Sequence, residues 1–163
     1  MKDKFIAWMK IIRLHFYPMT WIAYSLGAMA ASSNVQKWDL KIYWVGYLVL
    51  FFIELSTILT NEYYDYGTDR LNKNAGPFTG GTRVLVEGKL GFSEVRAGIL
   101  APLILALGFG YLLIRINEQV SSFSILLLIV TGLFLGLGYT APRLNSVIGD
   151  WGRSRLPLRT VPT

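Results

Sequence analysis

Long apolar runs separated by short polar stretches dominate the pattern of this sequence. Residues 97–114 and 120–139 carry no charged side chain. Each run approaches the ~20 residues that a helix needs to cross the hydrocarbon of a bilayer. Neither run alternates strictly between apolar and polar positions, as a half-buried strand would. The pattern therefore predicts two transmembrane helices in the C-terminal half of the chain.

Two further apolar runs lie in the N-terminal half. The first, residues 16–31, contains Pro18 near its start, where a helix tolerates proline. The second, residues 42–60, is interrupted only by Glu54. Ahead of both, residues 1–15 mix apolar side chains with lysines and an arginine, which predicts an amphipathic leader helix at the membrane surface. We therefore expect an all-α, polytopic membrane helix bundle with four transmembrane helices, at about 16–31, 42–60, 97–114 and 120–139.

The first apolar run has an alternative interpretation as a cleavable signal peptide. Ala28-Met29-Ala30 fits the small residues of a cleavage site. The long charged leader and the aromatic residues Tyr17, Trp21 and Tyr24 favour a retained transmembrane helix instead.

Composition and charge add a location and an orientation. Of the 163 residues, 53% are hydrophobic and only 16% are charged, whereas about 25% are charged in an average soluble domain. The net charge of +6 is uneven: 13 lysines and arginines lie in the leader, in residues 61–96 and in the tail, against 3 on the other side of the spans. The positive-inside rule then places the N-terminus and the loop 61–96 in the cytoplasm, with the spans in the inner or plasma membrane. The charge is therefore interpreted as topology, with no nucleic-acid partner. The absence of cysteine excludes disulfides and thiolate chemistry.

Polar chemistry concentrates in the loop that follows the second span. If that helix continues past the bilayer, Asn61, Asp65 and Asp69 lie at i, i+4 and i+8 on one face. Like charges at this spacing repel, and carboxylates at a helix C-terminus oppose the helix dipole. A divalent cation between them removes both penalties, and hard oxygen ligands of this kind suit Mg²⁺. The alternative is a solvated acidic helix end, with Gly67 stopping the helix.

The same loop carries cations interleaved with glycines. Glycines let a backbone approach a phosphate closely, and cations neutralise its charge. This combination predicts a site for a diphosphate–Mg²⁺ complex; the alternative is ordinary positive-inside charge. The candidate diphosphate-binding residues are Arg70, Lys73, Arg83 and Lys89, among Gly76, Gly80, Gly81 and Gly88.

These motifs resemble a known family. Asn61-x-x-x-Asp65-x-x-x-Asp69, directly after a predicted transmembrane helix, resembles the first aspartate-rich motif of the UbiA-type intramembrane prenyltransferases. The stretch Gly-Pro-Phe-Thr-Gly-Gly-Thr-Arg-Val-Leu, residues 76–85, is similar to the branch that prenylates dihydroxynaphthoate on the way to menaquinone. The resemblance implies Mg²⁺-dependent transfer of an isoprenyl group from an isoprenyl diphosphate to an aromatic, dihydroxynaphthoate-like acceptor. It implies catalytic roles for Asn61, Asp65 and Asp69, and metal binding by these three and by Glu62, which stands where the family often has Asp.

The family also implies a longer protein. Its members have about twice as many helices and a second aspartate-rich motif, whereas after Glu118 this sequence has only the acid Asp150. Residues 143–163 have neither a span nor helical periodicity, and in a shifted reading frame their codons permit a family-like continuation. We therefore expect an N-terminal half of such an enzyme, followed by a tail that is out of frame after about Pro142.

Two other function classes stay open. One is a small non-catalytic membrane protein, with oligomers possible, that binds lipid diphosphate or metal through the same loop. The other is a transport subunit that uses Glu54 as a proton site, since an ionisable group within a span is expensive and functional by default. For Glu54, a role in a cavity and a hydrogen bond between helices are both considered.

Overall fold

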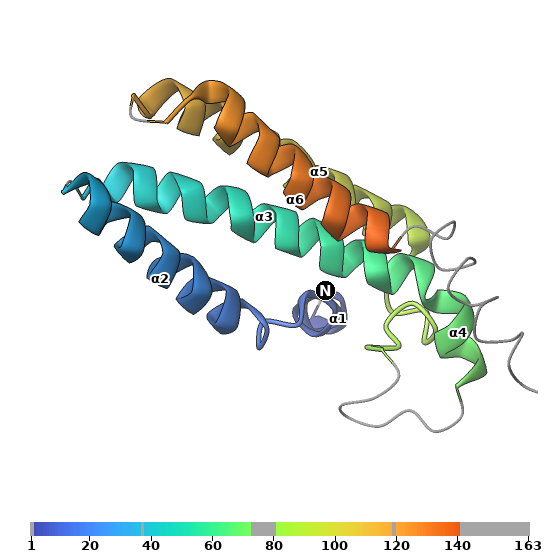
Figure 1. Ribbon diagram of the computed structural model, residues 1–163. Helices are drawn as coiled ribbons and strands as arrows, with labels where there is room; N and C mark the ends of the chain where they lie inside the picture. The colour runs from blue at the N-terminus through green and yellow to red at the C-terminus, as the bar shows by residue number, and fades with distance from the viewer. Residues whose placement is uncertain (1, 37, 73–80, 119, 141–163) are drawn as a thin grey trace, which may run out of the picture.

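The computed structural model describes residues 2–36, 38–72, 81–118 and 120–140, and the regular elements in these segments are all helical (Figure 1). The all-α prediction is therefore confirmed for the described part of the chain. The tail 143–163, with its expected change of reading frame, lies outside the described residues. The helices are α1 (Lys2–Ile12), α2 (Tyr17–Val35), α3 (Leu40–Tyr64), α4 (Tyr66–Leu71), α5 (Phe92–Ile116) and α6 (Ser122–Thr140).

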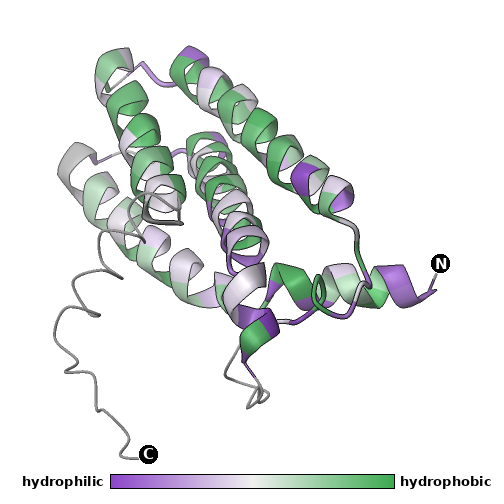
Figure 2. Ribbon diagram, turned by 90° about the vertical axis from the view of Figure 1, so that its right-hand side faces the viewer, coloured by the Kyte–Doolittle hydropathy of each residue, from purple (hydrophilic) through white to green (hydrophobic). Residues whose placement is uncertain are grey.

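Two of the described helices, α3 and α5, are long and apolar enough to cross a membrane. The apolar stretch of α6, Ser122–Gly138, is shorter, and tyrosines, serines and small residues dilute the hydropathy of α2. Large apolar side chains are exposed on the outer faces: Leu128 and Phe134 are each 71% exposed. Figure 2 shows hydrophobic residues along the long helices and hydrophilic ones mainly at their ends and connections. Such a surface is costly in water, and it indicates a membrane environment.

The helix α3 is central in the bundle, since it contacts α1, α2, α4, α5 and α6. Its contact with α6 is close: a Cβ added to Gly136 would lie 2.4 Å from Thr57 Oγ1. Its contact with α5 includes a hydrogen bond from Ser56 Oγ to the carbonyl oxygen of Ile99, at 3.2 Å. Small and hydroxyl side chains let helices approach each other in this way within membranes.

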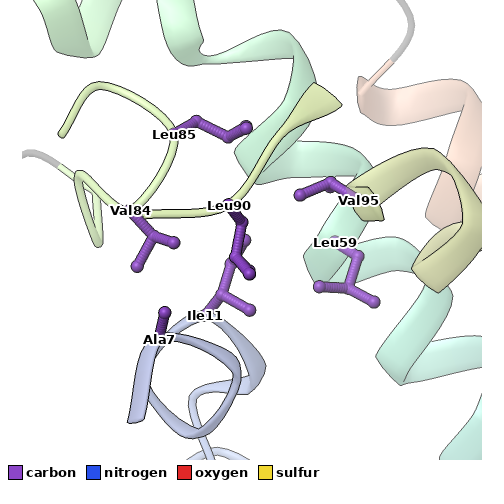
Figure 3. Close-up of a cluster of buried hydrophobic side chains, with 7 residues drawn as sticks. All are labelled: Ala7, Ile11, Leu59, Val84, Leu85, Leu90 and Val95. Atoms are coloured by element: carbon purple, nitrogen blue, oxygen red, sulfur yellow. The ribbon is translucent and has the colours of Figure 1, made fainter. Parts of the chain in front are cut away.

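One end of the bundle is held together by a buried apolar cluster, called the end cluster here and drawn in Figure 3. It joins α1, the C-terminal part of α3, the turn 81–91 and the start of α5, and α1 crosses this end of the bundle (Figure 2). The leader and the described part of loop 61–96, which the charge pattern assigned to one side of the membrane, thus meet at one end. The members are Ala7, Ile11, Leu59, Val84, Leu85, Leu90 and Val95.

The packing of α1 against α5 depends on Gly98, and this gives a first prediction. A Cβ added to Gly98 would lie 2.6 Å from Cη2 of Trp8, whereas one added to Gly108 would meet nothing within 4 Å. We expect Gly98→Leu to push α1 away from α5 and to accelerate tryptic cleavage after Lys10 and Arg13 several-fold in reconstituted vesicles. Gly108→Leu has the same gain in helix propensity and is expected to leave the cleavage rate unchanged. Equal rates for the two variants would contradict this packing.

Candidate functional site

We call the segment that carries Asn61, Asp65 and Asp69 the acidic helix end. It lies where α3 passes into α4. Asp65, with φ −75° and ψ −5°, separates the two helices. Its N–H donates to the carbonyl oxygen of Asn61 at 2.9 Å, and the N–H of Asp69 donates to that of Asp65 at 2.8 Å. Because this i to i−4 bonding runs across the break, the helix continues past Thr60 and carries Asn61, Asp65 and Asp69 on successive turns. The three residues can lie on one helix only because of this continuation.

The chain returns to the acidic helix end at Gly81. This glycine has a φ of +68°, and a Cβ added to it would lie 1.9 Å from Oδ2 of Asp69. The backbone of Gly81 therefore lies directly against the Asp69 carboxylate, at a position and in a conformation that favour glycine. Two residues later, Nη1 of Arg83 donates to the carbonyl oxygens of Asp69 and Asn72, each at 3.0 Å. These bonds place the guanidinium at the C-terminus of α4, beside Asp69.

A second connection holds the returning chain in place. Glu62 is buried, and its carboxylate forms an ion pair with the guanidinium of Arg13. The same carboxylate accepts hydrogen bonds from Thr82 Oγ1 at 2.6 Å and from the Thr82 N–H at 3.2 Å. We call Arg13, Glu62 and Thr82 the Glu62 tie. Since its carboxylate is engaged by protein donors here, Glu62 anchors the leader and the loop to α3; metal binding by Glu62 stays a prediction from the family resemblance.

Sequence reasoning counted Arg13 only as a positive charge near the membrane and missed this role. The residue lies in the turn after α1, with a φ of +53°. The structure shows that Glu62 is buried, and a buried carboxylate requires a partner such as a cation. The sequence does not indicate which of the many nearby cations folds onto it.

Electrostatics at the acidic helix end favour a cation. Burial raises the pKa of Asp65, as does the charge of Glu62, while Arg13 opposes the shift. Burial also raises the pKa of Asp69, together with Glu62 and Asp65, against Arg13 and Arg83. A raised pKa means that the folded state keeps the proton longer, so the metal-free protein loses stability as the pH rises from 3.8 through the raised values. A bound divalent cation would remove this repulsion.

The donor set fits Mg²⁺ that is shared with a phosphate ligand. In the described part of the chain, no three His, Cys, Asp or Glu side chains come together as a metal site. The acidic face offers two carboxylates and the Asn61 amide, and Mg²⁺ usually takes one or two carboxylates and completes its shell with water and substrate phosphate. Among the hydrogen bonds and ion pairs between described residues, none engages the carboxylate of Asp65 or Asp69.

The four predicted diphosphate-binding cations differ in their positions. Arg83 lies beside Asp69, as described above. Arg70 is exposed on α4, and Lys89 forms an ion pair with Glu87 at 2.6 Å. Lys73 lies outside the described residues, as do Gly76 and Gly80 of the glycine-rich stretch. Of the three cations that lie among the described residues, Arg83 is the one that contacts the backbone of the acidic helix end.

Glu54 lies on α3, seven residues before Asn61. Its Oε1 accepts a hydrogen bond from Thr20 Oγ1 of α2 at 2.9 Å. Of the two interpretations considered from the sequence, the structure therefore contains the hydrogen bond between helices. This bond leaves the second carboxyl oxygen of Glu54 available for a further contact.

The glycines at positions 81 and 88 give a matched pair of variants. Both have positive φ, +68° and +65°, but only Gly81 has a side chain against its Cβ position. Gly88→Ala is expected to cost only the backbone strain, about 1 kcal/mol. Gly81→Ala adds displacement of the Asp69 carboxylate and is expected to weaken Mg²⁺-induced thermal stabilisation by more than half. Thermal unfolding with and without Mg²⁺ measures this, and an equal Mg²⁺ response in the two variants would refute the contact.

Comparison of the chain with family models, with curated proteins and with solved structures gave no match. What the fold and the site define by themselves is a class: an all-helical, membrane-associated protein with an acidic helix end. A glycine backbone and an arginine close that end on one side.

Proposed function

We propose that the chain is the N-terminal half of a Mg²⁺-dependent intramembrane prenyltransferase of the UbiA type. It would transfer an isoprenyl group from an allylic diphosphate to an aromatic acceptor similar to dihydroxynaphthoate, as in quinone synthesis. The observation that carries the proposal is the acidic helix end itself. Asn61, Asp65 and Asp69 lie on successive turns, and the backbone of Gly81 meets the outermost carboxylate.

The residues have separable tasks in this reaction. Asn61, Asp65 and Asp69 would hold Mg²⁺, which when bound neutralises the diphosphate and stabilises it as a leaving group. Arg83 uses the two N–H groups of Nη1 for α4, and its other three donors are suited to diphosphate oxygens. The allylic C–O bond breaks with its electron pair going to the diphosphate. A ring carbon of the acceptor forms the new C–C bond and loses its proton.

The reaction needs a dry chamber, because water would capture the allylic cation. The face of α3 that turns toward α2 is aromatic: Tyr47 lies 6.3 Å from Phe51, and Phe51 lies 4.9 Å from Tyr17 of α2, between ring centroids. Aromatic faces stabilise nearby cations. The part of α3 around Tyr47 and Phe51, inside the proposed membrane region, therefore offers the aromatic lining that an allylic cation requires.

The proposal includes a topology of four spans in the inner or plasma membrane, with the N-terminus and the acidic helix end cytoplasmic. Support comes from the end cluster, which gathers the basic leader and the basic turn 81–91 at one end. Because the chain has no cysteine, single exposed cysteines can report sidedness. In intact cells we expect Ser121→Cys to react with a membrane-impermeant maleimide and Glu87→Cys to react only after permeabilisation. The reverse labelling pattern would contradict the orientation.

The activity is tested by transfer of labelled farnesyl diphosphate to 1,4-dihydroxy-2-naphthoate in membranes that contain the chain. A second sample contains a reconstruction in which the reading frame is restored after the Pro142 codon. Mg²⁺-dependent product in either sample supports the proposal, and product only in the reconstruction supports the half-enzyme expectation. Mg²⁺-dependent binding of farnesyl diphosphate without product in either sample would favour the non-catalytic alternative.

A further inference from the structure

The contact between α2 and α3 places polar groups inside the proposed membrane region. We call this contact the α2–α3 seam and define it by Tyr17 and Thr20 of α2 and by Tyr47, Phe51 and Glu54 of α3. The three α3 residues share a face at i, i+4 and i+7, and the two α2 residues are three apart. The rings of Tyr17 and Phe51 lie 4.9 Å apart, so the two faces are in contact.

The hydroxyl of Tyr17 is the unusual group in the seam. Tyr17 is only 6% exposed, and its Oη has no hydrogen-bond partner among the described residues. A buried hydroxyl without a partner costs about 1 to 3 kcal/mol, and the hydrocarbon region of a bilayer supplies no water to satisfy it. A ligand atom that accepts this proton would recover that energy.

Glu54 supplies the complementary group. One of its oxygens accepts the bond from Thr20 at 2.9 Å, and the carboxyl group can accept further bonds through the other. Its donor Thr20 lies one turn after Tyr17 on α2, and Tyr17 contacts Phe51, one turn before Glu54 on α3, so the phenol and the carboxyl lie in the same contact between the two helices. An ionisable group at this depth is kept at a cost and is expected to have a functional partner.

The position of the seam relates it to the acidic helix end. Glu54 precedes Asn61 by seven residues, which is about 10 Å along a helix that rises 1.5 Å per residue. A diphosphate held at Asn61, Asp65 and Asp69 would direct its allylic carbon toward the membrane interior. An aromatic ring bound in the seam would therefore meet that carbon.

We propose that the α2–α3 seam binds the ring hydroxyls of the aromatic acceptor, a dihydroxy-aromatic molecule. Tyr17 Oη donates to one ring oxygen, Glu54 accepts from a ring hydroxyl, and Phe51 and Tyr47 contact the apolar ring. The identity of the ligand rests on the proposed function. The polar pairing itself rests on the unpartnered phenol and the carboxyl beside it.

Equilibrium binding of radiolabelled 1,4-dihydroxy-2-naphthoate to the full chain in lipid nanodiscs tests this, without any need for turnover. We expect Tyr17→Phe to weaken binding about 10-fold, the loss of one neutral hydrogen bond, and Glu54→Gln to weaken it 10-fold or more. Tyr111→Phe makes the same chemical change on an exposed tyrosine of α5 and should bind as wild type. Unlabelled 1,4-dimethoxynaphthalene, which has no hydroxyl donor, should fail to compete.

The outcomes separate this proposal from the proposed function. Wild-type affinity in Tyr17→Phe and Glu54→Gln, or absence of saturable binding to the wild type, would overturn the seam as the acceptor site. Loss of binding in Asp65→Asn as well would also overturn it, by placing the acceptor on the acidic helix end. Binding that depends on Tyr17 and Glu54, when neither the chain nor the reconstruction forms prenylated product, would support the seam while removing the enzyme proposal. Circular dichroism of each variant confirms that the helices are retained.

Discussion

In the reconstruction with the restored reading frame, Asp65→Asn is expected to reduce Mg²⁺-dependent prenyl transfer at least about 100-fold, the scale of losing one electrostatic contact to the reacting charge. The substitution keeps the size of the side chain and the helical bonding across residue 65, but it removes a charge from the centre of the three-residue face. Glu87→Gln is the matched control, because Glu87 is an exposed acid at the same end of the bundle that pairs with Lys89. Equal loss in both variants, or activity retained in Asp65→Asn, would refute the assignment of the acidic face.

The same variant distinguishes loss of the metal from loss of the fold. Burial and the charge of Glu62 raise the pKa of Asp65, so its charge opposes folding at neutral pH when no metal is bound. We therefore expect Asp65→Asn to unfold at the same or a slightly higher temperature than wild type without Mg²⁺. Wild type should gain stability on addition of Mg²⁺ and farnesyl diphosphate, and Asp65→Asn should gain none.

Arg13→Ala is expected to give the largest loss of stability among single substitutions at this end. It leaves the buried carboxylate of Glu62 without its cation. Breaking a fully buried pair costs 3–5 kcal/mol, and because the Arg13 side chain is 30% exposed we expect a smaller loss, about 2 kcal/mol. Thermal unfolding of the protein in nanodiscs measures it.

Two further variants test the cause of that loss. Lys10→Ala removes an exposed cation from the same leader and is expected to change stability by less than about 0.5 kcal/mol. Adding Glu62→Gln to Arg13→Ala removes the uncompensated charge, so the double variant should recover part of the lost stability. If the tie were unimportant, Glu62→Gln would instead lower the stability of the Arg13→Ala protein further. A double variant that is less stable than Arg13→Ala would contradict the Glu62 tie.

The helices could be predicted from the sequence because their signals are local. Each apolar run corresponds to one observed helix and extends beyond it by two residues at most; the runs are 16–31, 42–60, 97–114 and 120–139. The mixture of apolar and basic residues in the leader likewise indicated an amphipathic helix. It did not indicate that Ala7 and Ile11 would pack in the end cluster, because composition does not show what covers an apolar side chain.

In the candidate site, too, the features that depend on local sequence could be predicted and the long-range contacts could not. The spacing of Asn61, Asp65 and Asp69 depends only on one continuous helix, and the backbone bonding across Asp65 supplies that continuity. The Glu62 tie joins residues that are 49 and 20 positions apart, and no local pattern encodes such pairings. The approach of Gly81 to Asp69 follows from the same tie, because Thr82 is fixed to Glu62 one residue later.

The most direct test of the acidic helix end is Mn²⁺ binding, followed by electron paramagnetic resonance, to the full chain in nanodiscs with farnesyl diphosphate. Mn²⁺ replaces Mg²⁺ at oxygen sites of this kind and needs no turnover to be detected. We expect diphosphate-dependent Mn²⁺ binding in wild type and in Glu87→Gln, and its loss in Asp65→Asn. Mn²⁺ binding that is absent from wild type, or that persists unchanged in Asp65→Asn, would contradict a metal–diphosphate site at this helix end.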